Sequence, residues 1–253
     1  MTHPYRLAQL TWKEVETRVN ECKIILVPIG STEQHGPALP LDNDYFIATR
    51  FAELICEALW PDVKVTMAPT IAFGYSAHHM DFKGTISLDE LTLASVIVDI
   101  VKSLSHHGFE NIILLNGHGG NETGISLAIN RLHEGSIRKV FSIGWWTMIS
   151  DRIPELFTRP VCHACDMETS VAWALGQRVL EDRRVDEPGR IPYPGFIEPD
   201  MLSTSAQIQT GLSMKDYTDS GVIGYSTRAS VEKGKKAVEL VVNRIVEFIN
   251  SLI

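Results

Sequence analysis

The sequence contains little cysteine and has no excess of positive charge. Only 4 of its 253 residues are cysteine, too few for a disulfide-stabilised scaffold, so we expect reduced thiols in a cytoplasmic protein. The net charge of −8 argues against nucleic acid as the main partner, because binding it usually requires a concentrated basic face. No apolar run reaches the ~18 residues of a membrane-spanning helix, and the N-terminal stretch lacks the apolar region of a secretory signal. These absences exclude membranes and nucleic acid as expected partners.

Several enzyme signatures are also missing. The chain has no G-x-S-x-G, H-E-x-x-H, Walker A or complete G-x-G-x-x-G motif, so serine hydrolases, zincins, P-loop enzymes and dinucleotide enzymes would each lack their usual signature. One C-x-x-C pair is present, at Cys162 and Cys165, but a structural zinc site would need a second pair. Asp166 stands where c-type haem attachment would need histidine. We therefore interpret the two cysteines as packing residues.

What is present is an alternation of short apolar runs and amphipathic segments. The predicted strands are 23–30, 63–73, 111–117 and 138–146. The predicted helices are 44–60, 122–134, 167–180 and 229–252, with one more that begins at a capping box of Ser87 and Glu90 and ends at Gly108. Repeated strand–helix alternation predicts parallel strands joined by crossover helices. We expect an α/β fold, a three-layer α/β/α sandwich with a mostly parallel sheet.

Residues 184–227 interrupt this alternation. They contain prolines 188, 192, 194 and 199 with scattered serine, threonine and glycine. Such a long excursion in a compact domain is usually functional, so we expect it to cover a site or to contact a neighbouring subunit. No internal repeat or clear boundary is visible, and residues 1–253 are predicted to form a single domain.

Metal-capable side chains follow the first and third predicted strands. Glu33 and His35 follow the first, His118 follows the third, and Asp44 begins the next helix. In open parallel sheets ligands bind outside the carboxyl ends of the strands, so these groups are predicted to meet at one edge. Carboxylates and imidazoles without thiolate suit Zn²⁺, Mn²⁺ or Fe²⁺ in a catalytic site. Glycines around His118, including Gly119, would let a substrate approach closely.

Simpler roles exist for several of these residues. A glutamate and a histidine in a loop are often solvated, and the glycines beside His118 could form only a tight turn. Asp42 and Asn43 are plausible helix caps. The histidine pairs at 78–79 and 106–107 are ambiguous, and the second pair could complement a helix dipole.

Four stretches, taken together, resemble the creatininase (creatinine amidohydrolase) family. They are, in chain order, GSTEQHGPALPLDND, GYSAHHMDFKGTISLDELT, NGHGGNE and HACDMETS. The resemblance implies an α/β/α fold with a binuclear centre of two divalent metal ions per chain, Zn, Mn or Fe. It also implies a small-molecule substrate and a homo-oligomer, in many members a hexamer.

The resemblance also implies roles for single residues. Glu33 and His118 would bind one metal, His35 would bind the other, and Asp44 would bridge them. His163 aligns with a histidine that transfers protons in the family. Candidates for contact with substrate are His78, His79, Gly119 and Trp146.

The chain departs from creatininase itself at one metal ligand. Creatininase carries a glutamate ligand where this sequence has Gly120. The replacing acid would be Glu122 or Glu168, and we expect Glu168 as the metal ligand because Glu122 can cap the following helix. Glu122 stays a catalytic candidate.

The departures point away from creatinine as the substrate. The expected function is binuclear-metal-dependent hydrolysis of a non-peptide C–N bond in a small molecule, either a cyclic amide or a formamide. The alternatives are hydrolysis of a C–C bond in an oxidised inositol ring and a non-catalytic metal-binding scaffold protein.

Overall fold

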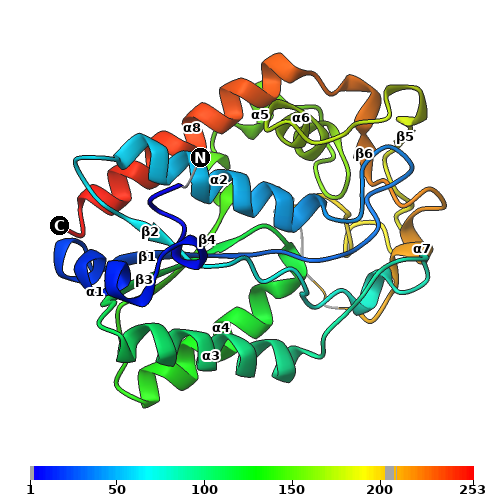
Figure 1. Cartoon of the computed structure of the whole chain (residues 1–253). Coiled ribbons are helices and arrows are strands. Elements are labelled where there is room, and N and C mark those ends of the chain that lie inside the picture. The colour runs from blue at the N-terminus through cyan, green and yellow to red at the C-terminus, as the bar shows by residue number, and fades with distance from the viewer. Residues whose placement is uncertain (1–2, 203–207, 209) are drawn as a thin grey trace.

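The computed structural model describes residues 3–202, 208 and 210–253, and its centre is a four-stranded parallel sheet (Figure 1). The strand order is β2-β1-β3-β4. The strands are β1 (Ile24–Ile29), β2 (Thr66–Met67), β3 (Asn111–Asn116) and β4 (Val140–Gly144). β1 and β3 are buried along their whole length, as expected for parallel strands covered on both faces. The predicted α/β fold is confirmed.

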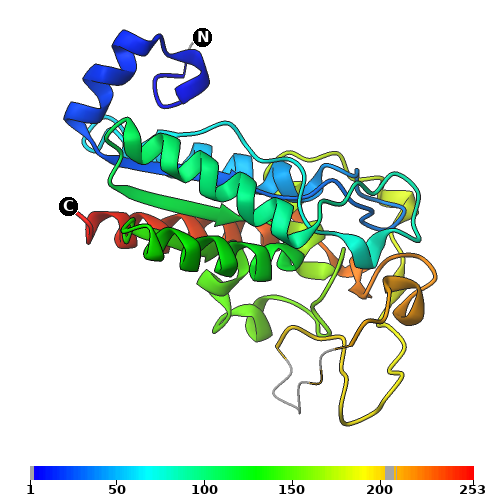
Figure 2. The same ribbon diagram turned by 90° about the horizontal axis from the view of Figure 1, so that it is seen from below.

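Helices cover both faces of this sheet (Figures 1 and 2). The main helices are α1 (Trp12–Glu21), α2 (Asn43–Leu59), α3 (Glu90–His106), α4 (Glu122–Glu134), α6 (Asp166–Ala174) and α8 (Val231–Asn250), and α5 (Ile153–Leu156) is a single turn. Alternate residues of β1 point to opposite faces: Ile24 and Leu26 pack with α2, α6 and α8, whereas Ile25 and Val27 pack with α3 and α4. The three layers follow from this alternation. No helix within the described ranges is long and apolar enough to cross a membrane.

The strand order creates a crevice between β1 and β3. The chain leaves β1 for β2 on one side of it, and then crosses back to place β3 on the other side. Strand order reverses at this point, and such switch points are where open α/β sheets bind ligands. The loops that follow β1 and β3 therefore flank the crevice.

Two predicted boundaries in the first half of the chain are wrong. The strand predicted over 63–73 forms a regular ladder only at Thr66–Met67, because Pro69 has no N–H to donate. α3 begins at Glu90, and its N-cap is Asp89, whose side chain accepts the N–H groups of Leu91 and Thr92. Ser87 is therefore not the cap.

α6 is shorter than predicted, and α1 has no counterpart among the predicted elements. α6 ends at Ala174 because Gly176, at φ +94°, closes a Schellman turn in which the N–H of Gln177 bonds to the C=O of Ala172. α1 begins at a capping box formed by Thr11 and Glu14. The other helices lie within two residues of their predicted ends.

The excursion at 184–227 lies against the loop that follows β1. It contains β5 (Asp186–Glu187) paired antiparallel with β6 (Gly224–Tyr225), and the short helix α7 (Met214–Tyr217). Ile223 exchanges two backbone hydrogen bonds with His163. The C=O of Gly221 accepts a hydrogen bond from the side chain of Gln34. The excursion therefore contacts residues at the carboxyl edge of the sheet.

Candidate metal centre

Four parts of the chain bring metal-capable side chains together at this edge. Glu33 and His35 lie in the loop after β1, Asp44 is in the first turn of α2, and His118 follows β3. Glu168, in the first turn of α6, and His163, just before that helix, complete the group. All six side chains are buried. The predicted convergence of distant segments at one edge is thus observed.

Asp44 lies between two histidines and presents one oxygen to each. Its Oδ1 is 2.9 Å from His35 Nε2, and its Oδ2 is 3.2 Å from His118 Nδ1. Beyond them lie two more carboxylates: Glu168 Oε1 is 3.2 Å from His35 Nε2, and Glu33 Oε2 is 3.2 Å from His118 Nε2. Asp44 therefore belongs to two sets of possible ligands.

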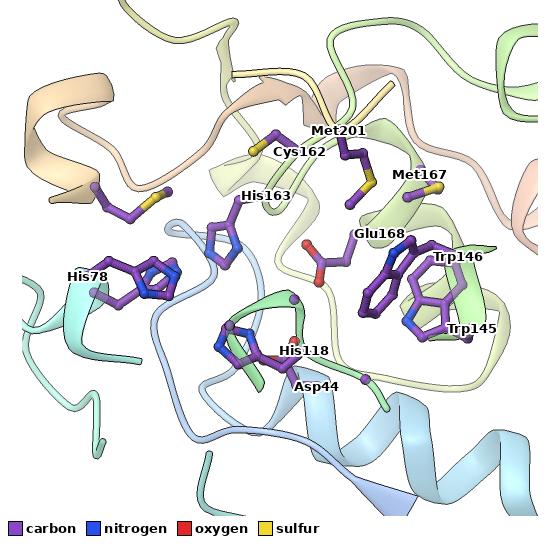
Figure 3. A pocket seen from close by; sticks show the side chains of 15 residues that line it. Asp44, His78, His118, Trp145, Trp146, Cys162, His163, Met167, Glu168 and Met201 are labelled. Carbon is purple, nitrogen blue, oxygen red and sulfur yellow. The ribbon is translucent and has the colours of Figure 1, made fainter. Parts of the chain in front are cut away.

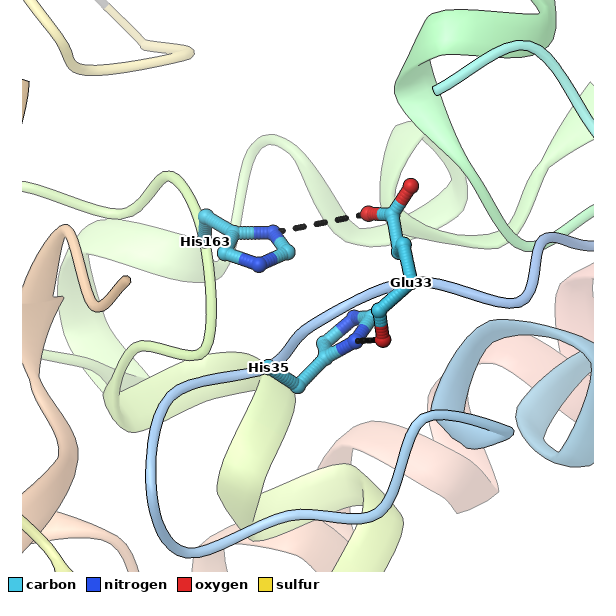
Figure 4. Close-up of side chains that lie close together, drawn as sticks. All are labelled: Glu33, His35 and His163. Carbon is cyan, nitrogen blue, oxygen red and sulfur yellow. Dashed lines mark hydrogen bonds and ion pairs between the residues drawn. The ribbon is translucent and has the colours of Figure 1, made fainter. Parts of the chain in front are cut away.

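These side chains form three groups in which the ligand atoms lie within 4.8 Å of one another. The groups are Glu33–Asp44–His118, His35–Asp44–Glu168 and Glu33–His35–His163. Figure 4 shows the third, with His163 Nδ1 3.9 Å from Glu33 Oε1. Glu122 belongs to none of them and is exposed in the first turn of α4.

Backbone carbonyl groups orient three of the rings. His35 Nδ1 bonds to the C=O of Glu33 at 3.1 Å, His118 Nε2 to that of Tyr75 at 2.8 Å, and His163 Nε2 to that of Gln34 at 2.7 Å. Since a carbonyl oxygen only accepts, each of these nitrogens carries the hydrogen. The other nitrogen of each ring faces a carboxylate: Nε2 of His35 faces Asp44, and Nδ1 of His118 does the same. Nδ1 of His163 faces Glu33, which also lies 3.2 Å from the Nε2 of His118. One ring nitrogen held by a carbonyl and the other left for a metal is the arrangement of metal-binding histidines in proteins.

The charge balance of the site fits a divalent cation. Burial alone would lower the pKa of His35, but the carboxylates of Asp44 and Glu168 raise it well above the usual value. In the same way, Glu33 and Asp44 raise the pKa of His118 against the effect of burial. Glu33 Oε1 and Asp44 Oδ2 are buried and accept no hydrogen bond within the described residues. The oxygen and imidazole donors suit a metal such as Zn²⁺ or Mn²⁺.

A cavity of about 260 Å³ opens beside these groups (Figure 3). His78, His79, Gly119 and Trp146, the candidates for contact with substrate, all line it. His79 is more deeply placed than expected, since its Nε2 lies 3.3 Å from Glu33 Oε1. Burial and the charge of His118 lower the pKa of His78 to about 4. His163 also lines the cavity, and its pKa is lowered by burial and by His35.

Sequence reasoning missed several residues around the site. Ser76 donates a hydrogen bond to Glu33 Oε2 and lies 2.5 Å from Ser31, Oγ to Oγ. Gln34 contacts both His79 and the excursion. Ser31 and Gln34 stand next to the metal-capable pair in the sequence, which is the one signal that could have drawn attention to them. Four cavity-lining residues were also missed: Trp145, Met167, Met201 and Met214.

The fold and the site together define an α/β protein with a buried centre for divalent metal. Residues 8–249 match the family described as creatinine amidohydrolase. The chain therefore belongs to the creatininase (creatinine amidohydrolase) family and is a hydrolase. The predicted family and enzyme class are confirmed.

Curated relatives of this chain differ in the activities for which they are named. A 3-dehydro-scyllo-inosose hydrolase of Thermotoga maritima is 29% identical over 96% of this chain and 82% of the relative. A creatinine amidohydrolase of Pseudomonas putida is 29% identical over 96% of this chain and 95% of the relative. A mycofactocin precursor peptide peptidase of Mycobacterium ulcerans is 36% identical over 84% of this chain and 78% of the relative.

Solved structures of creatininase share the fold and contain metal. A variant described as Zn-Zn type has a TM-score of 0.81 at 28% identity, covering 98% of both chains. A manganese form has a TM-score of 0.80, with the same identity and coverage. These structures and the three groups of possible ligands support a divalent metal in this chain.

Proposed function

We propose that this hydrolase uses two divalent metal ions to cleave a non-peptide C–N bond in a small molecule, either a cyclic amide or a formamide. The observation that carries the proposal is the position of Asp44, whose two oxygens face different histidines. A carboxylate shared by two sets of buried ligands is suited to bridge two cations. The metals, when bound, would polarise the carbonyl oxygen of the substrate and lower the pKa of water.

The two sets of ligands divide naturally around Asp44. Glu33 and His118 would hold one ion, and His35 and Glu168 the other. Glycine at position 120 is consistent with this division, because a Cβ atom there would lie 2.4 Å from His118 Nε2 and from the C=O of Tyr75. In this proposal the acid of the second set is Glu168 of α6.

In the proposed reaction His163 would transfer a proton. Its Nε2 donates to the C=O of Gln34, and this leaves Nδ1 directed toward Glu33 (Figure 4). Through Nδ1 the ring would take a proton from the attacking water and give it to the leaving nitrogen. General acid catalysis of this kind typically contributes ~10²–10⁴-fold in rate.

The test is metal content per chain, measured by elemental analysis of protein purified without chelator. Wild type is expected to hold two equivalents, and Asp44→Asn, which keeps the size of the side chain, one or none. Asp42→Asn is the matched control, because Asp42 faces Gln177 at 2.8 Å and belongs to neither set. Two equivalents and full turnover in Asp44→Asn would overturn the bridging role.

A second candidate function is hydrolysis of a C–C bond in an oxidised inositol ring. Similarity to the Thermotoga maritima hydrolase over 96% of the chain favours it. The products separate the two candidates: C–N hydrolysis releases an amine, with formate when the substrate is a formamide. C–C cleavage gives a carboxylic acid and no amine.

A further inference from the structure

Part of the cavity wall consists of apolar side chains that the proposed metal centre does not use. Trp145 and Trp146 lie on one side, beside Glu168, and Met201 projects toward the cavity from the excursion (Figure 3). Met167 and Met214 add two more buried thioethers. Tryptophan rings pack flat against other rings, and methionine adapts to them and makes favourable sulfur–aromatic contacts. This wall suits a flat apolar group.

The same wall provides no positive side chain. Among the described residues that line the cavity there is no lysine or arginine. The thiol of Cys162 is neutral, because burial raises its pKa to about 12.

Three cations from the surrounding loops are held by other groups. Arg159 binds Asp200 at 2.8 Å, and Arg190 binds Asp219 at 2.9 Å. The Lys215 ammonium lies 4.4 Å from the centre of the Phe82 ring. A phosphate ester seated against this apolar wall would therefore lose its hydration without gaining a lysine or arginine partner.

We propose that the enzyme acts on substrates in which an uncharged, flat apolar group lies next to the C–N bond, seated against Trp146 and the methionines, and that it rejects substrates that carry a phosphate on this group. This inference rests on the proposed C–N hydrolase function. The volume of about 260 Å³ is below the ~300–1,000 Å³ of sites for drug-sized ligands. The enclosed group is therefore small, of the size of one aromatic ring.

A matched pair of formamides tests the proposal: N-formyltyramine and its O-phosphate, which differ only in the phosphate on the phenol. In each case water adds its oxygen to the formyl carbon, the C–N bond breaks, and the nitrogen leaves with a proton as tyramine or its phosphate, together with formate. We expect kcat/KM of the metal-loaded enzyme to be about 30–100-fold lower for the phosphate, mostly through KM, because the buried charge is unpaired.

A charge introduced into the wall should reduce this preference. Met201 is 42% exposed, so Met201→Lys can be made without disturbing the core, and it should raise kcat/KM for the phosphate about tenfold by pairing the charge. Met80→Lys is the control, since Met80 is 55% exposed and lies outside the cavity lining. It should leave the ratio of kcat/KM between N-formyltyramine and its phosphate unchanged.

Binding separates failure of this inference from failure of the proposed function. Equal cleavage of both formamides would overturn the inference and leave C–N hydrolysis intact. If neither is cleaved, quenching of tryptophan fluorescence reports binding. Tighter binding of N-formyltyramine than of its phosphate would then support the apolar subsite and count against the proposed reaction. Equal binding, or no binding of either compound, would overturn the inference.

Discussion

Gln34 connects the metal-capable residues to the excursion through one side-chain amide. Its Nε2 donates to His79 Nδ1 at 2.9 Å and to the C=O of Gly221 at 3.1 Å, while its Oε1 accepts the N–H of Gly36 at 2.9 Å. The amide can therefore point only one way, and His79 Nδ1 must be an acceptor. The hydrogen of His79 is then on Nε2, which faces Glu33 Oε1 at 3.3 Å.

This geometry predicts that His79 positions Glu33. Replacing His79 by leucine should weaken Zn²⁺ binding about 10–100-fold, because the carboxylate loses the imidazole nitrogen that faces its Oε1 at 3.3 Å. His79→Gln, which keeps a side-chain N–H, should restore much of the affinity. Affinity is measured by competition with a chromogenic chelator.

The control for this prediction is His106→Leu, at the exposed end of α3, which should bind zinc as wild type does. An unchanged affinity in His79→Leu would mean that Ser76 and His118 alone hold Glu33 in place.

At the scale of elements, the turn after α7 is held by Glu187 of β5. The carboxylate accepts the N–H of Asp219 at 2.8 Å and both the N–H and the hydroxyl of Ser220, at 3.0 and 2.5 Å. Partial burial would raise the pKa of Glu187, but hydrogen bonds from Ser220, Thr218 and the backbone lower it to about 2. This turn leads directly to Gly221 and Ile223, which contact the site.

Glu187 should therefore make stability depend on pH in the acid range. Its pKa is lower in the folded state, about 2 against 4.5, so its contribution is complete above pH ~4.5 and is lost as pH falls toward 2. We expect Glu187→Gln to lower the free energy of unfolding by about 1 kcal/mol at pH 7, less than for a buried charged hydrogen bond because the side chain is partly exposed.

Urea unfolding at pH 7 and in steps down to pH 3 measures this difference. The difference in the free energy of unfolding between wild type and Glu187→Gln should become smaller as the pH falls. Glu134→Gln, at the exposed end of α4, is the control and should show no such difference. A difference in unfolding free energy that stays constant with pH would contradict the lowered pKa of Glu187 in the folded state.

At the scale of the whole molecule, the metal centre joins the two sides of the strand-order reversal. Its proposed ligands come from the loops after β1 and β3 and from α2 and α6. The three carboxylates Glu33, Asp44 and Glu168 lie close together away from water, so without a cation they repel one another. Bound metal should therefore stabilise the fold as a whole.

Thermal unfolding tests this expectation. Removing metal with a chelator should lower the Tm, and adding zinc back at about 100 times its Kd should restore about 2.7 kcal/mol of stability per site. In Asp44→Asn the change in Tm between metal-free and metal-loaded protein should be much smaller. An equal Tm with and without chelator, in protein whose metal content is measured, would show that the centre contributes nothing to folding.

How much could be predicted from the sequence differed between the fold and the site. The run of strands and helices could be predicted because apolar periodicity is local, and parallel strands share an edge, which placed Glu33 and His118 together. The N-cap of α3 could not be predicted, because Ser87 and Asp89 are both good capping residues and stand two residues apart. Only the packing of Ser87 against Ser76, whose N–H it accepts at 2.8 Å, decided between them.

The sequence by itself determined the family, the α/β class and the chemical type of the site, because these depend on residue identity and on local spacing. Tertiary structure alone decided the contact between Gln34 and Gly221, which are 187 residues apart, and the apolar wall that Met201 and Met214 contribute. The physical reason is that the excursion has no periodic pattern. Its position is set by hydrogen bonds to residues far away in the chain, and these exist only after the sheet has brought the two parts together.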